Sequence, residues 1–279
     1  MEFLSGLLNV AVIVFSVSAM LSMGLGNELK EVLGPLRGIG RVSRALLANF
    51  VLVPLLTLAI LHVVSLDRPL QTGLLLISTA AGAPFLIKLI ETAGGNLGFS
   101  VSLLVLLLPV TVVYMPAVVP LLVPGTMVNA GAIAMPLFLT MLLPLAVGLF
   151  VRARRPGQAR RLQPVIGATS TVALLILVLT TLVTYFPEIA GIFGTGAILS
   201  SLLVIGGAFA IGYVLGGADP DAREVLGLGT SQRNIAAATV VATQSFSDPR
   251  TVVIVVVSSL AGLALLFPVA WMLRKRRKT

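Results

Sequence analysis

Long apolar runs constrain this chain more than any other feature of its sequence. The segment Leu4–Gly24 holds no charged residue, and a helix of about 20 apolar residues crosses the hydrocarbon core of a bilayer. Because lipid offers no hydrogen bonds, every backbone N–H and C=O there must be paired within the protein, which leaves helices and closed barrels. The sequence therefore predicts an all-α polytopic membrane protein.

Composition supports this class and excludes several chemistries. Hydrophobic residues make up 57% of the 279 residues and charged residues 10%, whereas a soluble domain carries roughly 25% charge. The chain has no cysteine, which rules out disulfides and thiolate metal sites. Its single histidine, His62, is expected at a membrane interface and not as a catalytic base. The N-terminus lacks a basic n-region and an A-x-A site, so the first span is expected to be retained.

Hydropathy and turn signals predict nine transmembrane helices. The charged segment 27–41 after the first span is expected to be an interfacial connection. The predicted spans are Leu4–Gly24, about Val42–Val64, Pro69–Ala93, Leu97–Val123, Ala130–Val151, Val165–Phe186, Gly196–Leu215, Asp221–Thr243, and Asp248 to the Trp271 anchor.

Basic residues cluster outside these spans, at 30–44, 152–161 and 274–278. Positive charge marks cytoplasmic loops, so we expect a multi-pass protein of the cell (inner) membrane with its N-terminus outside and its C-terminus cytoplasmic. Such clusters could also bind nucleic acid, but apolar spans separate them here. We therefore expect the lipid bilayer as partner and no nucleic acid.

Two of the predicted spans are interrupted, and both carry charge. Gly82 and Pro84 break the third span before Lys88 and Glu91, and the run Gly229–Asn234 breaks the eighth around Arg233. Charge at membrane depth is costly and usually functional. Interrupted segments in corresponding places of two halves indicate a transporter binding site. The pattern predicts an inverted repeat of four plus five spans, 1–129 and 130–279.

The candidate substrate-binding residues lie at these interruptions or face them. Arg233 can hold a carboxylate through two hydrogen bonds and never titrates, whereas Lys88 can titrate when buried. Glu91, one turn on, can pair with Lys88, which leaves proton coupling open. The remaining candidates are Asn49, Thr230, Gln232 and Asn234.

Each candidate also has a purely structural interpretation. Lys88 and Glu91 could form a structural ion pair, and Arg233 could bind carbonyls exposed by the broken helix. Asn49 could join neighbouring helices. Thr230 and Gln232 could satisfy unwound backbone.

Four motifs together resemble the bile acid:sodium symporter family. They are S-M-G-L-G-N-E-L (22–29), A-N-F-V-L-V-P-L-L (48–56), G-G-N-L-G-F-S-V (94–101) and P-D-A-R-E-V-L-G-L-G-T-S-Q-R-N-I-A-A-A-T-V-V-A (220–242). The resemblance implies nine helices where the first of ten is absent, a panel domain, and a core domain with two broken crossing helices. Its members move organic anions, usually with two Na⁺.

The departures from that family concern its sodium ligands. The family's Ser-Asn pair falls on Leu86 and Ile87, a Thr falls on Leu104, the Glu falls on Gly229 and a Gln falls on Arg233; a second Gln falls on Asn49. Aliphatic side chains supply no oxygen, and a guanidinium supplies only donors. The resemblance thus implies altered sodium sites, with no bound metal or cofactor. Lys88 and Arg233 are expected to stand in for the sodium ions.

The function expected from all of this is secondary transport of small organic anions by alternating access. A sodium-coupled symporter is one alternative, and a passive channel is another, although a channel would need a continuous polar path. We expect no enzyme, because the sequence has no H-E-x-x-H motif, no Ser-His constellation and no paired intramembrane aspartates. An arsenite carrier would be expected to offer a cysteine. The sequence leaves the substrate and the oligomeric state open.

Overall fold

The computed structural model describes residues 2–28, 38–123 and 130–277, with side chains from residue 6 onward. Within those ranges the chain is helical and contains no β-strand. The predicted interfacial connection 27–41 lies mostly outside the described residues. The elements are α1 (Glu2–Gly26), α3 (Ile39–Leu47), η2 (Ala48–Leu52), α4 (Val53–Val63), α5 (Arg68–Thr79), α6 (Leu86–Ala93), α7 (Leu97–Leu122), α8 (Ala130–Leu137), η3 (Phe138–Leu142), α9 (Leu143–Arg154), α10 (Pro156–Thr184), α11 (Phe186–Ile192), α12 (Ala197–Leu215), α13 (Pro220–Ser231), α14 (Ile235–Ser245) and α15 (Pro249–Arg276).

Seven stretches among the described residues are long and apolar enough to cross a membrane, namely α1, α3–α4, α7, α8–α9, α10, α12 and α15. Two further pairs of shorter helices, α5 with α6 and α13 with α14, are each separated by a few non-helical residues. These gaps fall at the two predicted interruptions. The structure thus contains both long apolar helices and half-helices, as a polytopic membrane protein with two broken spans requires.

The helices differ from the sequence prediction in one start and in one additional helix. Helix α10 begins at Pro156 and not near Val165, because the basic segment after α9 is itself helical and Pro156 suits a first turn. The short helix α11 was not predicted. Asp219 caps α13, since its side chain accepts a hydrogen bond from the Asp221 amide.

Two π-helical turns, η2 and η3, each end two residues before a proline, Pro54 and Pro144. In η2 the Val53 N–H bonds five residues back to the Ala48 carbonyl. The next residue, Pro54, has no N–H to donate. The Asn49 carbonyl is therefore left without a donor from its own helix, and π-turns of this kind often occur at functional sites.

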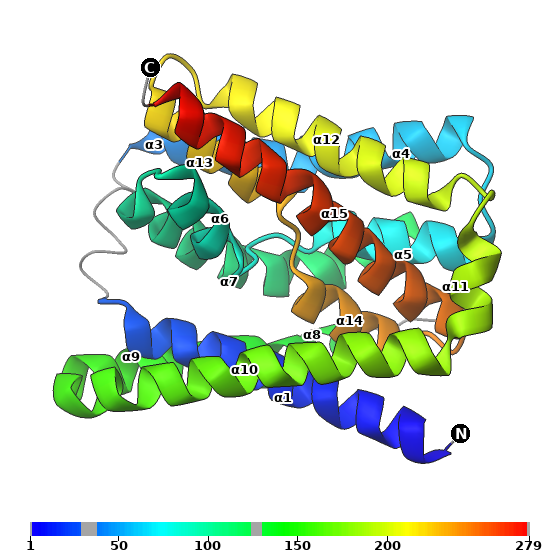
Figure 1. Cartoon of the computed structure of the whole chain (residues 1–279), viewed down its shortest axis with the longest axis horizontal. Helices are drawn as coiled ribbons and strands as arrows, with labels where there is room; N and C mark the ends of the chain where they lie inside the picture. Colours follow the sequence, from blue (N-terminus) through cyan, green and yellow to red (C-terminus); the bar gives the residue numbers. More distant parts are fainter. Residues whose placement is uncertain (1, 29–37, 124–129, 278–279) are drawn as a thin grey trace.

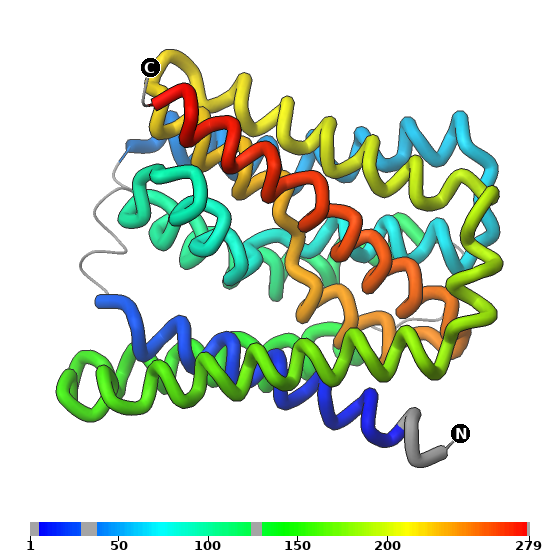
Figure 2. Tube along the Cα trace, viewed as in Figure 1, coloured from blue at the N-terminus to red at the C-terminus, as the bar shows by residue number. Residues whose placement is uncertain are grey.

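The helices form two groups in Figure 1. Helices α1, α9 and α10 pack together along the lower side of the view, whereas α4 and α12 lie along the upper side, and α15 runs diagonally from the upper left to the lower right. Helices α8 and α14 contact each other between these groups. The tube in Figure 2 shows the segments of both interruptions near mid-depth of the bundle.

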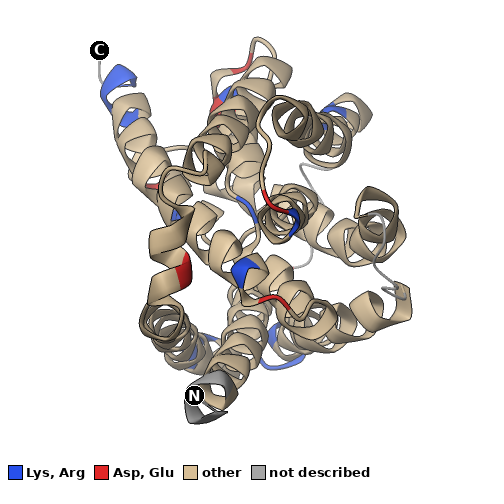
Figure 3. Ribbon diagram, turned by 90° about the vertical axis from the view of Figure 1, so that its right-hand side faces the viewer, with Lys and Arg blue, Asp and Glu red and all other residues tan. Residues whose placement is uncertain are grey.

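Charge is concentrated at the ends of the bundle. The ends of α9 and α15, with Arg152, Arg154 and Arg274, lie on the left of Figure 1. Figure 3 views the opposite end, where the ribbon is mostly tan and acidic and basic segments lie close together. One end is thus strongly basic and the other is mixed.

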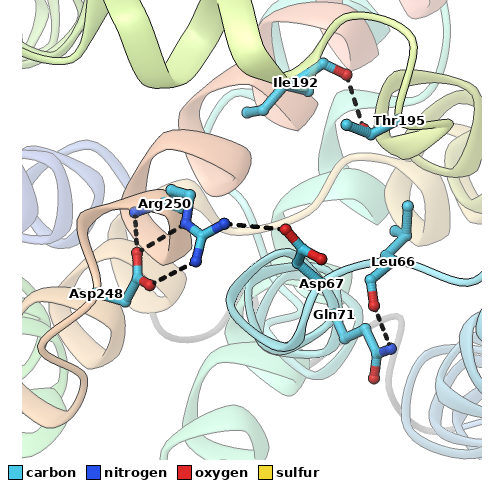
Figure 4. A network of polar contacts seen from close by, with 7 residues as sticks. All are labelled: Leu66, Asp67, Gln71, Ile192, Thr195, Asp248 and Arg250. Atoms are coloured by element: carbon cyan, nitrogen blue, oxygen red, sulfur yellow. Dashed lines mark hydrogen bonds and ion pairs between the residues drawn. The ribbon is translucent and has the colours of Figure 1, made fainter.

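At the mixed end, one arginine joins the starts of two helices. Arg250 pairs with Asp248 at 3.0 Å and with Asp67 at 3.0 Å (Figure 4). Asp67 precedes α5 and Asp248 caps α15. The side-chain hydrogen bond from Arg250 holds the pKa of Asp248 below its ordinary value. This network fixes the first broken helix to α15.

Candidate functional site

The two interruptions lie against each other in the middle of the bundle. The Asn234 amide donates to the Ala80 carbonyl at 2.9 Å, and its side-chain Nδ2 donates to the Gly82 carbonyl at 3.0 Å. The Oδ1 atom of Asn234 accepts from the Ala237 amide and so caps α14. One asparagine therefore starts the second half-helix and holds the unwound backbone of the first interruption.

Gly82 and Thr111 explain how the first interruption keeps its shape. Gly82 has a φ of 78°, and a Cβ there would lie 3.1 Å from the backbone nitrogen of Leu108. Only glycine meets both conditions without strain. The Thr111 hydroxyl accepts from the Ala81 amide at 3.2 Å and donates to the Ala81 carbonyl at 3.0 Å. Helix α7 thereby satisfies backbone groups that the break exposes.

Arg233 lies in this crossing with all its N–H groups engaged. Its Nε donates to the Ile77 carbonyl at 3.2 Å, and Nη1 donates to Asn49 Oδ1 at 2.8 Å and to the Thr230 carbonyl at 3.0 Å. Its Nη2 donates to the carbonyls of Asn49 and Ser78. A guanidinium has five N–H donors. Five oxygens thus surround the cation, and the side chain is only 4% exposed.

The carbonyl ligands lie at helix ends or at the π-turn, where they keep a lone pair for Arg233; the Ile77 carbonyl also accepts the Ala80 amide at 3.2 Å. Ile77 and Ser78 belong to the last turn of α5, and Thr230 belongs to the last turn of α13. The last carbonyls of a helix have no intrahelical donor and carry partial negative charge. The Asn49 carbonyl in η2 is available because Pro54, at the start of α4, has no N–H to donate to it. The fold therefore aims two helix C-termini and a π-turn at one point.

No carboxylate hydrogen-bonds the guanidinium, since all its partners among the described residues are carbonyl or amide oxygens. The charge is compensated by dipoles alone. Half-helix C-termini and unwound carbonyls are the groups that coordinate Na⁺ in many secondary transporters. The five oxygens thus form a cation-binding arrangement that the chain fills with its own side chain.

The structure gathers five of the predicted site residues around this point. Asn49 donates through Nδ2 to the Thr230 hydroxyl at 3.2 Å while its Oδ1 accepts from Arg233. Gln232 is buried and lines a small cavity beside Arg233, with Ser258 and Ser259 of α15, and Asn234 follows Arg233 directly. The cavity, about 10 Å³, lies at the lower limit for a single water molecule.

Lys88 and Glu91 lie elsewhere, which corrects the expectation that Lys88 joins Arg233 near the bilayer middle. The buried face of α6 consists of Leu86, Leu89, Ile90 and Ala93, so Lys88 points away from the crossing. The Lys88 side chain is 67% exposed and pairs with Glu91 at 2.8 Å. The predicted pairing of these two residues is confirmed, but the pair does not contact the oxygens that hold Arg233.

Aliphatic side chains fill the space beside Gly229. A Cβ at Gly229 would lie 2.5 Å from Cδ2 of Leu103 and 3.1 Å from Cδ2 of Leu86. Leu86, Leu103 and Leu104 are all buried. Leu86, Leu104 and Gly229 are positions onto which the resemblance maps sodium ligands. Hydrocarbon therefore occupies this part of the crossing, and within the described residues no cluster of three metal-ligating side chains occurs.

The structural interpretation of Arg233, that it binds carbonyls exposed by the broken helices, is confirmed by its hydrogen bonds to Ile77, Thr230 and Ser78. The sequence did not predict the role of Thr111 or which carbonyls bind Arg233. Pro54 was a readable signal for one of them, because a proline five residues after Asn49 frees a carbonyl near it. The carbonyls of Ile77 and Ser78 had no such signal, since any residue at a helix C-terminus would present one.

Comparison with known proteins decides what kind of protein carries this crossing. A model of the Sodium Bile acid symporter family matches residues 12–191, more than half of the chain. The chain belongs to this family. The match includes the first interruption of this family member and ends before the second. The protein is therefore a helical membrane protein of a transporter family.

A relative of this symporter-family member is known from rice. The Oryza sativa subsp. japonica protein named "Probable sodium/metabolite cotransporter BASS2, chloroplastic" is 29% identical over 202 residues, which is 70% of this chain and 47% of the rice protein. The chain thus spans about half the length of that relative. That name describes cotransport of sodium and a metabolite by the rice protein.

Proposed function

We propose that this protein is a secondary transporter of small organic anions that works by alternating access without sodium. In this proposal Arg233 occupies the place of a sodium ion. The observation that carries it is the guanidinium held by five oxygens where the two interruptions meet. Family membership supports the transport function, and the hydrogen bonds of Arg233 at the crossing support the absence of sodium coupling.

The proposed topology counts each pair of half-helices as one interrupted crossing. Added to the seven long spans, the two pairs give nine crossings, which divide into inverted repeats at 1–129 and 130–279. Helices α1, α9 and α10 would belong to the panel, and the two interrupted pairs would form the centre of the core. The basic end would face the cytoplasm, with the N-terminus outside, in the cell (inner) membrane.

A tethered cation changes the energetics of the cycle. Bound Na⁺ stabilises a crossing only when its concentration exceeds its Kd, whereas Arg233 is always present and always charged. Leu86 and Leu103 fill the space beside Gly229 with side chains that offer no oxygen. Leu104, another position onto which the resemblance maps a sodium ligand, is a buried leucine. The crossing would then keep its shape at any sodium concentration.

The anion would bind away from the five N–H groups of Arg233, because these are already used. The Lys88–Glu91 pair is the exposed alternative on the first broken helix. A substrate carboxylate that paired with Lys88 would displace Glu91, and this exchange would be the point at which a proton could couple to transport. The start of α14 at Ile235 would add partial positive charge at the crossing.

Two other functions are distinguishable from this one. A sodium-coupled symporter, as the rice relative's name describes, would need oxygen ligands that Leu86 and Gly229 do not supply. A passive channel would need a continuous polar path, whereas the polar residues here concentrate at the interruptions.

Uptake into proteoliposomes tests the proposal. The purified protein is reconstituted and offered labelled keto acids, pantoate-like acids and sterol acids, with a gradient of NaCl or of choline chloride, at two external pH values. We expect uptake of at least one anion at equal rates in both salts. Strong, saturable stimulation by Na⁺ would overturn sodium independence, and efflux at channel-like rates without saturation would overturn alternating access.

A further inference from the structure

An apolar groove runs along the outer side of α10, away from the crossing. It has a volume of about 630 Å³ and is lined by Val14 of α1 and by Pro164, Val165, Ala168, Thr169, Val172, Ala173 and Ile176 of α10. The α10 residues recur every three or four positions, so they form one face of the helix. The neighbouring α1 packs closely on α10 and supplies the other wall.

The length of the groove matches one leaflet of a bilayer. From Pro164 to Ile176 the helix rises about 18 Å at 1.5 Å per residue. Half of the hydrocarbon core measures about 15 Å. The groove therefore begins near the headgroup region at the basic end of the bundle and ends near the bilayer middle, which is the span of a single acyl chain.

Two arginines continue the same helical face toward the headgroups. Arg160 and Arg161 precede Pro164 and Val165 by four residues, so they lie one turn beyond the mouth of the groove. Both are exposed, and neither makes an ion pair with any residue that the structure describes. Their neighbours are engaged, because Arg152 pairs with Glu28 at 3.0 Å and Arg154 lies over the Phe150 ring.

We propose that this groove binds an anionic phospholipid, with an acyl chain between α1 and α10 and the phosphate on Arg160 and Arg161. Basic residues at the cytoplasmic ends of transmembrane helices attract anionic lipids, at about fivefold in affinity for each arginine. A zwitterionic lipid would fill the groove equally well, but its own ammonium group neutralises its phosphate, so only a lipid of net negative charge compensates the two guanidinium groups. Charge thus selects the lipid, and the groove fixes its position.

Tryptophan quenching by brominated lipids tests this directly, because the chain has one tryptophan. Trp271→Phe removes it, and Ile176→Trp places a reporter at the deep end of the groove. The protein is reconstituted in vesicles of dioleoyl phosphatidylcholine with increasing fractions of dibrominated phosphatidylglycerol or dibrominated phosphatidylcholine. A matched reporter, Val113→Trp with Trp271→Phe, lies on α7 at a position that is 72% exposed.

From the quenching of the Ile176→Trp reporter we expect an apparent affinity for brominated phosphatidylglycerol at least fivefold higher than for brominated phosphatidylcholine. For the Val113→Trp reporter, the ratio of the two affinities should be near one. Adding Arg160→Gln and Arg161→Gln should abolish the preference without changing the thermal-unfolding midpoint. Inorganic phosphate should weaken the preference for phosphatidylglycerol no more than sodium chloride of equal ionic strength does. Equal quenching by both lipids would overturn the proposal. Quenching by neither would also overturn it and would indicate a second copy of the chain in the groove.

Discussion

The Nη1 group of Arg233 donates a 2.8 Å hydrogen bond to Oδ1 of Asn49, from the second interruption to the π-turn η2. The two residues lie 184 positions apart in the sequence. Their contact joins the element before the first broken helix to the centre of the second. Replacing either residue should therefore alter the crossing as a whole.

Asn49→Ala should destabilise the protein by about 2 kcal/mol, the range for a lost hydrogen bond to a buried charged group. The variant leaves Arg233 one oxygen short and removes the donor to the Thr230 hydroxyl. The measurement is the thermal-unfolding midpoint in detergent. Thr57→Val is the matched control, because the buried Thr57 hydroxyl bonds only within its own helix. An equal decrease in the unfolding midpoint of both variants would mean that the Asn49–Arg233 contact stabilises the protein no more than a hydrogen bond within one helix.

Gly229→Ala should also destabilise the protein, by about 1–3 kcal/mol from overpacking, since the new Cβ would lie 2.5 Å from Cδ2 of Leu103. Combining it with Leu103→Ala should recover part of the loss, with a coupling of about 1 kcal/mol in a double-mutant cycle. Gly157→Ala serves as control, because no atom lies within 4 Å of a Cβ there. Additive effects in the cycle would contradict close packing of leucine against Gly229.

Much of this crossing was predictable, and the failures have physical reasons. The two broken spans could be identified from the sequence. Gly82 and Pro84 indicated the first, and the charge of Arg233 among polar residues indicated the second. The prediction that Lys88 lies beside Arg233 was wrong because it did not consider which face of α6 carries Lys88. The spacing of Leu86, Leu89, Ile90 and Ala93 already defines a buried face that excludes it. Which carbonyls of α5 and α13 bind Arg233 could not be predicted, because a main-chain acceptor carries no sequence identity.

Lys88→Ala should leave stability nearly unchanged and reduce anion uptake. Exposed ion pairs contribute about 0–1 kcal/mol, and the Lys88 side chain is 67% exposed. If Lys88 binds the anion, the KM for uptake should rise at least tenfold while the unfolding midpoint stays constant. Arg154→Ala, which removes another exposed cation, is the control. Unchanged uptake by the Lys88 variant would leave its pair with Glu91 as a surface feature only.

The contact between Arg250 and Asp248 should make stability depend on pH at the mixed end. The pKa of Asp248 is lowered in the folded protein, chiefly by the hydrogen bond from Arg250. Its contribution is therefore complete above the ordinary aspartate pKa of about 3.9 and is lost as the pH falls through the lower folded value.

Arg250→Gln removes that donor, so the difference in unfolding midpoint between wild type and variant should be constant above about pH 5 and shrink below about pH 4. Unfolding midpoints between pH 6 and pH 3 measure it. Arg68→Gln, next to Asp67 but outside the network, should show no such trend. A difference for Arg250→Gln that did not change with pH would contradict the lowered pKa.

The most direct test of the tethered cation is the response of thermal stability to sodium. The unfolding midpoints of the wild type and of Arg233→Gln are compared in NaCl and in choline chloride of equal ionic strength. The variant removes the guanidinium and leaves its five oxygens facing an open cation position. We predict equal wild-type midpoints in both salts, and a variant that is less stable in choline chloride and partly restored by Na⁺. A saturable, sodium-specific rise in the wild type would contradict the account.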